Sequence, residues 1–114
     1  TSGTTLEDSF EMGFGRTKYF LIYDTETKTT KAVNNDQNMF ATQGAGIQAA
    51  QFVANEGVQG VITGHCGPKA FRVLQAAGIS VYYTNVTRCV EAVEAFSAGK
   101  LTPVASADVE GHWA

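Results

Sequence analysis

A histidine and a cysteine stand next to each other on a glycine-rich turn in the middle of the chain, Gly64-His65-Cys66-Gly67. Thiolates and imidazoles are ligands that zinc, copper and iron–sulfur species prefer. Pro68 follows the turn and suits the first position of a helix, because its missing N–H needs no partner there. The N-terminus of a helix favours anions and thiolates. His65 and Cys66 are therefore candidate contacts for a soft metal or an anionic ligand.

Charged residues, glycines and a second cysteine could complete such a site. Arg16, Lys69 and Arg88 could supply positive charge, and Cys89 falls within the first turn of a later predicted helix. Glycines at positions 44, 46, 64 and 67 would let a ligand approach the backbone closely. Each residue also has a plainer interpretation. A cysteine is most often a small buried hydrophobe, and a loop histidine or arginine is often an ordinary surface residue.

The elements that would position these residues follow from the hydrophobic pattern. Runs of β-branched and aromatic residues predict strands, and apolar residues at helical spacing predict helices. The expected strands lie near 18–23, 29–33, 58–62 and 79–83, and the expected helices near 44–56, 68–77 and 87–98. The first two strands would form an antiparallel hairpin, and the last two, joined by a helix, would be parallel.

This order of elements places the candidate residues at one edge of the sheet. A crossover between parallel strands is right-handed in nearly all proteins, so the loops at 64–67 and 84–87 should emerge on the same side. Ligands of open α/β sheets bind outside the carboxyl ends of the strands. We expect the helix that begins near Gly44 to join them, so that three helix N-termini converge on one region.

Composition limits the remaining possibilities. A chain of 114 residues with 44% hydrophobic content predicts a single domain over 1–104, followed by a tail over 105–114. The net charge of −3 argues against nucleic acid as the main partner. No apolar run reaches the length that crosses a membrane, and two cysteines suggest reduced thiols in the cytoplasm rather than a disulfide framework.

Familiar motifs for cofactors and catalysis are missing from the sequence. There is no Cys-x-x-Cys pair, no Walker A motif and no Gly-x-Gly-x-x-Gly. A tetrahedral zinc site would need His65, Cys66, Cys89 and His112 together. A thiol hydrolase would need His65 and Cys66 to face each other, which neighbours on one loop seldom do.

Several ordered motifs resemble the dinitrogenase iron–molybdenum cofactor biosynthesis family, of the NifX and NifB C-terminal domain type. The resemblance covers nearly the whole chain. It rests on Phe14-Gly15-Arg16, Tyr19-Phe20-Leu21-Ile22, Gly44-Ala-Gly-Ile-Gln-Ala-Ala50, Gly64-x-x-Gly-Pro-x-Ala-Phe71 and the ending Val109-Glu-Gly-His-Trp113.

The resemblance implies a fold and a function. The fold would be a three-layer α/β/α arrangement of the ribonuclease H-like type, with a mixed five-stranded sheet. The function would be non-enzymatic binding and carrying of an anionic metal–sulfur cluster, containing molybdenum with iron or, in members of the orange-protein type, with copper, and held without covalent attachment. Partners would be proteins that donate or accept the cluster, with a homodimer as an option and neither nucleic acid nor membrane involved.

The same resemblance assigns the site. Residues at its motif positions would line the cluster pocket: Arg16, Gly44, Ala45, Gly46, Gly64, His65, Cys66, Gly67 and Pro68. His65 and Cys66 lie inside the matching loop, and their role as metal ligands is a hypothesis for this chain, based on their residue types, rather than a rule of the family. No catalytic residue is implied, and ribonuclease activity does not follow from the fold, because Asp8, Asp24 and Glu26 have no evident partners.

One departure from the family concerns the first strand. Members usually begin with an apolar strand of about six residues ahead of the Ser-Gly-Thr segment, whereas this sequence starts at Thr1-Ser2-Gly3-Thr4. A sheet that lacks this central strand would leave backbone groups unpaired. We expect that the strand precedes the printed sequence or that another chain supplies it.

Two other classes of function stay open at this point. A binding module for phosphate or a nucleotide would need the glycines and Arg16 but neither thiol. A regulatory interaction domain without metal would recognise partners through aromatic side chains such as Tyr82, Tyr83 and Trp113.

Overall fold

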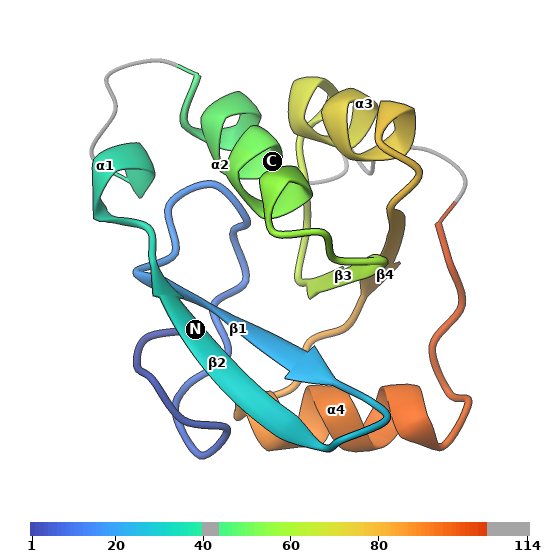
Figure 1. The fold of residues 1–114 in the computed structure, drawn as a ribbon. Coiled ribbons are helices and arrows are strands. Elements are labelled where there is room, and N and C mark those ends of the chain that lie inside the picture. Colours follow the sequence, from blue (N-terminus) through green and yellow to red (C-terminus); the bar gives the residue numbers. More distant parts are fainter. Residues whose placement is uncertain (40–43, 105–114) are drawn as a thin grey trace.

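The computed structural model describes residues 1–39 and 44–104, and these form a mixed α/β fold (Figure 1). The predicted class and order of elements are confirmed. The elements are β1 (Tyr19–Asp24), β2 (Thr29–Asn34), α1 (Asp36–Met39), α2 (Ala45–Asn55), β3 (Gly60–Thr63), α3 (Pro68–Ala76), β4 (Ser80–Tyr83) and α4 (Cys89–Ser97). None of these helices is long and apolar enough to cross a membrane.

The strands form two separate pairs. β1 and β2 are antiparallel, with Tyr19 opposite Asn34. β3 and β4 are parallel, with Gly60 opposite Ser80, as the helix between them predicts. Within the described residues no ladder joins one pair to the other, so the expected mixed sheet is divided between β1 and β3.

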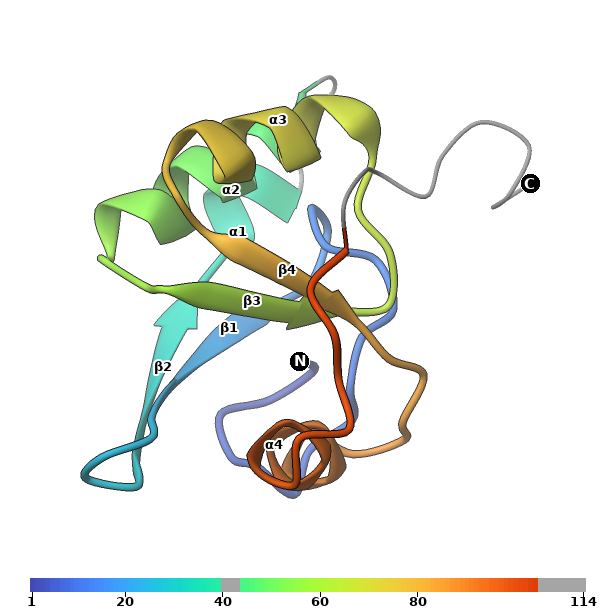
Figure 2. The same ribbon diagram turned by 90° about the vertical axis from the view of Figure 1, so that its right-hand side faces the viewer.

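Helices cover both faces of the strands (Figure 2). α2 and α3 pack side by side on one face, and α4 lies on the other. The core lies beneath α2 and α3, where Ala49, Ala50 and Leu74 have no measurable exposure. Glycines end these helices, because Gly57 and Gly78, each at φ 77°, adopt the left-handed conformation that other residues avoid.

The start of α4 differs from the prediction. Its first amides are bound by the loop near the chain start, since Cys89 N–H donates to the Asp8 carbonyl (3.0 Å) and Val90 N–H to the Leu6 carbonyl (2.7 Å). The Glu91 carboxylate also accepts from Arg88 N–H at 2.8 Å, as the glutamate of a capping box does. The expected convergence of three helix N-termini is therefore wrong. α4 lies across the sheets from the other two, and its start is already capped.

A short helix, α1, lies between β2 and α2, where the hydrophobic pattern predicts neither a helix nor a strand. The Asn34 side chain accepts a hydrogen bond from Asp36 N–H at 2.7 Å, which starts the turn. A helix of 4 residues is too short to show hydrophobic periodicity, so the sequence pattern could not indicate it.

Candidate functional site

The three glycine-containing segments of the predicted site come together in space. Gly15 packs so closely on the first turn of α2 that an added Cβ would lie 2.7 Å from the Gly46 Cα. A Cβ on Gly46 would in turn lie 3.3 Å from the Ala70 Cβ of α3. His65 N–H donates to the Met12 carbonyl (2.9 Å) and fixes the turn after β3 against the same loop. The loop before β1, the start of α2 and the start of α3 thus form one region.

Two helix N-termini face this region without a side-chain cap. Gly44 precedes α2 and Gly67 precedes α3, and no side chain of the described residues caps either helix. A Cβ added at Gly44 or Gly67 would meet no atom within 4 Å, so the backbone is open on this side. The first amides of a helix carry the positive end of its dipole and lack partners inside the helix. Such a region suits an anion.

Positive side chains accompany only part of the site. Arg16 follows Gly15 and is exposed, and Lys69 is exposed in the first turn of α3. Arg88 lies at the start of α4, on the other face, where it forms an ion pair with Glu7 at 2.7 Å. Arg88 is thus not one of the cations of the candidate site.

Cys66 faces the interior. Its side chain is 1% exposed and belongs to the apolar core, whereas Cys89 is 8% exposed. The hydroxyl of Tyr83, on β4, donates to the Cys66 carbonyl at 3.3 Å and so fixes the turn that contains Cys66. The turn therefore does not leave Cys66 open, because the thiol packs beneath it and is less exposed than Cys89. His65, next to it, is only partly buried.

The donor set does not form a site for a bare metal ion. Within residues 1–39 and 44–104 no group of three or more His, Cys, Asp or Glu side chains could hold one. The zinc site drawn from His65, Cys66, Cys89 and His112 is divided by the sheets, since Cys89 belongs to α4, and His112 falls outside the described residues. Backbone amides and positive charge suit a bulky anion, such as a metal–sulfur cluster that brings its own sulfide ligands.

Sequence reasoning missed Asn35, which positions the loop before β1. This residue is fully buried, and its side-chain amide donates to the Thr17 carbonyl (2.7 Å) and the Gly15 carbonyl (3.2 Å). Its own oxygen accepts from the Asn38 amide at 2.7 Å. An asparagine within a polar stretch gives no sign of burial, so only the structure identifies it.

Two of the aromatic residues proposed for partner recognition, Tyr82 and Tyr83, make contacts within the chain and are partly buried. Tyr82 stacks edge-on against Phe96 with ring centroids 5.2 Å apart, and Tyr83 binds the Cys66 carbonyl. Trp113 falls outside the described residues. The hypothesis of a regulatory interaction domain that recognises partners through these aromatic side chains therefore has little support in the described residues.

Comparison with known proteins identifies the family. The model of the family described as "Dinitrogenase iron-molybdenum cofactor" matches residues 1–99. The chain belongs to this family. The resemblance found in the sequence is confirmed. The four motifs between Phe14 and Phe71 lie within the matched range, whereas the ending Val109-Glu-Gly-His-Trp113 lies beyond it.

Two solved structures superpose closely on the fold described above, and a third protein is similar in sequence. The apo form of the orange protein from Desulfovibrio gigas superposes with a TM-score of 0.92 at 34% identity, over 96% of this chain and 92% of that one. A putative NifB protein from Thermotoga superposes with a TM-score of 0.83 at 33% identity, over 97% of this chain and 94% of that one. An uncharacterized protein of Methanocaldococcus jannaschii is 36% identical over 90 residues, which are 77% of this chain and 76% of that protein.

Proposed function

We propose that this chain is a non-enzymatic carrier of an anionic metal–sulfur cluster. The cluster would be a precursor of the iron–molybdenum cofactor or a molybdenum–copper sulfide, as family membership suggests. The observation that carries the proposal is the pairing of two uncapped helix N-termini, at Gly44 and Gly67, over one glycine-lined surface.

The geometry accounts for recognition of such a cluster by charge and shape. The amides at the starts of α2 and α3 donate to the sulfides of the cluster, and the two dipoles favour its negative charge. Gly44 and Gly67 leave open space beside the helix starts, and Arg16 adds a formal charge at the rim. Gly46 and Gly64 act differently, because a Cβ there would meet Ala70 and Met12, so these two glycines allow the segments around the site to pack closely. Ala45 and Pro68 lie in the first turns of the two helices and complete the predicted lining.

Of the two proposed metal ligands, His65 is the accessible one. His65 is only partly buried, whereas the Cys66 thiol would have to leave the core to reach a cluster. We therefore assign His65 to direct contact, and Cys66 to packing beneath the turn. This assignment predicts that replacing Cys66 leaves cluster binding largely intact.

Three finer points belong to the same proposal. The domain would have the five-stranded, ribonuclease H-like sheet that the family suggests. The carrier would work in the cytoplasm, where thiols stay reduced. It would exchange its cluster with donor and acceptor proteins rather than transform it.

Anaerobic reconstitution with iron, molybdate, copper and sulfide tests the proposal. Metal and sulfide analysis and a visible spectrum would be recorded for the wild type and for Arg16→Gln, Cys66→Ala and Arg72→Gln. Arg72 is an exposed arginine further along α3 and serves as the matched control.

The variants have distinct expected outcomes. The wild type, Cys66→Ala and Arg72→Gln should each hold a stoichiometric coloured complex, and Arg16→Gln should hold less. Loss of the complex in Cys66→Ala alone, with the fold intact by circular dichroism, would make Cys66 a ligand after all. If no protein binds a cluster under any of these conditions, the carrier function is refuted.

The uncapped helix N-termini also favour a second candidate, a binding module for phosphate or a nucleotide. This module would use the same amides and Arg16 and would need neither His65 nor Cys66. Saturable binding of inorganic phosphate or a nucleotide by protein that forms no cluster complex would establish it. Binding of the cluster but not of phosphate would exclude it.

A further inference from the structure

The helices on the two faces of the molecule carry charges of opposite sign. α2 and α3, on one face, hold two charged side chains between them, and both are cations, Lys69 and Arg72. α4, on the other face, holds Glu91 and Glu94 and no cation (Figure 2). Since the whole chain has a net charge of −3, Lys69 and Arg72 form a local surface of the opposite sign. We call this surface the α3 face.

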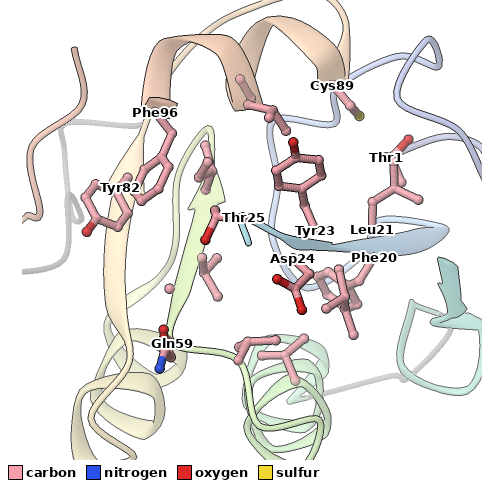
Figure 3. Close-up of a pocket in the computed structure, with 18 of the residues that line it drawn as sticks. Thr1, Phe20, Leu21, Tyr23, Asp24, Thr25, Gln59, Tyr82, Cys89 and Phe96 are labelled. Carbon is pink, nitrogen blue, oxygen red and sulfur yellow. The ribbon is translucent and has the colours of Figure 1, made fainter. Parts of the chain in front are cut away.

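The acidic side of the molecule continues from α4 to a cavity of about 570 Å³ between β1 and β3 (Figure 3). The charged side chains that line this cavity are all acidic: Asp24, Glu26 and Glu56. By contrast, the segment from Gly57 to Val90, which contains α3, has no Asp or Glu. A negatively charged partner is therefore repelled at α4 and at the cavity, and attracted at the α3 face.

The two cations of the α3 face are available to a partner. Both are exposed, and residues three apart on a helix lie on the same side of it. Among the described residues neither Lys69 nor Arg72 forms an ion pair, whereas Arg88, beside α4, pairs with Glu7 at 2.7 Å. Binding of a partner's carboxylates would therefore displace no ion pair within the described part of the chain.

The position of Lys69 is unfavourable for its own helix. A cation in the first turn opposes the helix dipole, and acidic residues are preferred there. α4 follows this preference with Glu91, whereas α2 and α3 have no acidic residue in their first turns. Residues that break a local rule of stability are expected at functional sites. The positive charge on α3 thus points to a role in binding rather than in holding the helix.

We propose that the α3 face binds an acidic surface on the protein that donates or accepts the cluster. This inference rests on the carrier function proposed above. Arg72 lies about 7–8 Å along the helix axis from Gly67, where the backbone is open. A partner bound at Lys69 and Arg72 would therefore adjoin the open start of α3, and the cluster would cross only a short distance between the two proteins.

The small number of charges favours a protein over other acidic macromolecules. Nucleic-acid binders typically contact about six to ten phosphates, and membrane surfaces are recognised by clusters of about four to eight cations. Among the described residues the exposed large hydrophobic side chain is Phe96 of α4, so the α3 face offers none to a bilayer. Two cations on a polar surface suit a small, brief protein contact that is steered by charge.

The test uses the full chain, labelled with nitrogen-15 and free of cluster, and an alanine-rich helical peptide with glutamates three and four residues apart along one side. The same peptide with glutamine in place of glutamate is the uncharged control. Backbone amide chemical shifts locate the bound peptide and give its dissociation constant. The variants are Arg72→Gln and Lys100→Gln, because Lys100 is an exposed cation beyond the end of α4 and serves as the matched control.

The glutamate peptide should shift the amides of α3 and leave those of α4 unchanged, and the glutamine peptide should shift neither. Arg72→Gln should weaken binding by about two- to fivefold, and Lys100→Gln should leave it unchanged. Equal effects of the two substitutions, or shifts spread over all exposed cations, would overturn the α3 face as a binding surface.

Vesicles that contain phosphatidylserine and a DNA duplex are tested with the same proteins. Binding of either in an Arg72-dependent way, without binding of the glutamate peptide, would overturn the assignment to an acidic protein. Cluster uptake is measured separately by reconstitution. Uptake of the cluster without peptide binding would refute the α3 face and keep the carrier function. Peptide binding at α3 by a chain that takes up no cluster would keep the surface and refute the carrier.

Discussion

Gly15 and Gly46 hold the loop before β1 against α2, with no room for a side chain between them. Replacing Gly15 with alanine would place a methyl group 2.7 Å from the Gly46 backbone, and the loop would have to move. We expect the Gly15→Ala substitution to lower the free energy of unfolding by about 1–3 kcal/mol, measured by urea titration.

Gly67→Ala is the matched control for this prediction. Gly67 has φ −68°, which alanine adopts readily, and no atom lies within 4 Å of the added methyl group. The change in unfolding free energy should stay within about 0.5 kcal/mol. Equal effects of the two substitutions would contradict the close packing of the loop on α2.

The two cysteines should react slowly with an alkylating agent in the native protein. Cys66 is buried in the core. Cys89 lines the cavity between β1 and β3, and its thiol donates to the Ser9 carbonyl at 3.7 Å. We expect Cys89 to be modified before Cys66 in the native protein, and both to react at the same rate in denaturant. Mass analysis of the peptides measures the two rates. Faster labelling of Cys66 in the native state would show that its turn opens.

At the scale of elements, Asn35 joins the end of β2 to the loop that carries Arg16. Asn35→Ala would leave the buried carbonyls of Gly15 and Thr17 without this donor. We expect a loss of about 2 kcal/mol in unfolding free energy and weaker cluster binding, measured by urea titration and by reconstitution.

Asn85→Ala is the control for that substitution, because Asn85 is exposed in the loop before α4. Its effect on stability should stay within about 0.5 kcal/mol. If Asn35→Ala were equally mild, Asn35 would not position the loop. If it lowered stability alone, with cluster binding unchanged, the loop would not belong to the site.

Most elements could be predicted because their signals are local. Each signal depends on only a few neighbouring residues. Examples are the strand-forming run from Tyr19 to Asp24, Pro68 at the start of α3 and Gly78 after its end. The cap of α4 could not be predicted, since its carbonyls come from Leu6 and Asp8, about 80 residues away.

The proximity of the candidate segments was predictable, but the orientation of their side chains was not. Strand order places the turn after β3 beside the start of α2, and the structure bears this out at Gly46 and Ala70. The direction of a single side chain depends on the packing around it, and no sequence pattern shows that Cys66 points into the core. The burial of Asn35 was hidden for the same reason.

At the scale of the whole molecule, the net charge of −3 does not favour binding of an anion. Electrostatic attraction of an anionic cluster must therefore come from groups close to the site. Raising salt from about 0.1 to 1 M shortens the Debye length from about 10 to about 3 Å. We expect cluster affinity, measured by competition with a chelator, to fall severalfold over this range, and to fall less in Arg16→Gln. A flat response in the wild type would point to direct ligation, with His65 as the first residue to replace.

The contact between the loop at Leu6 and the start of α4 bears on the order of folding. The segment from β3 to β4 needs only neighbours along the chain, and α3 closes it over a short loop. α4 finds its cap only after the chain has closed a loop from Leu6 to Val90. Contacts between residues far apart in the sequence form slowly, because the chain loses the entropy of closing the loop before the contact stabilises it. α4 should therefore dock last, and during synthesis it must wait until nearly the whole domain has left the ribosome.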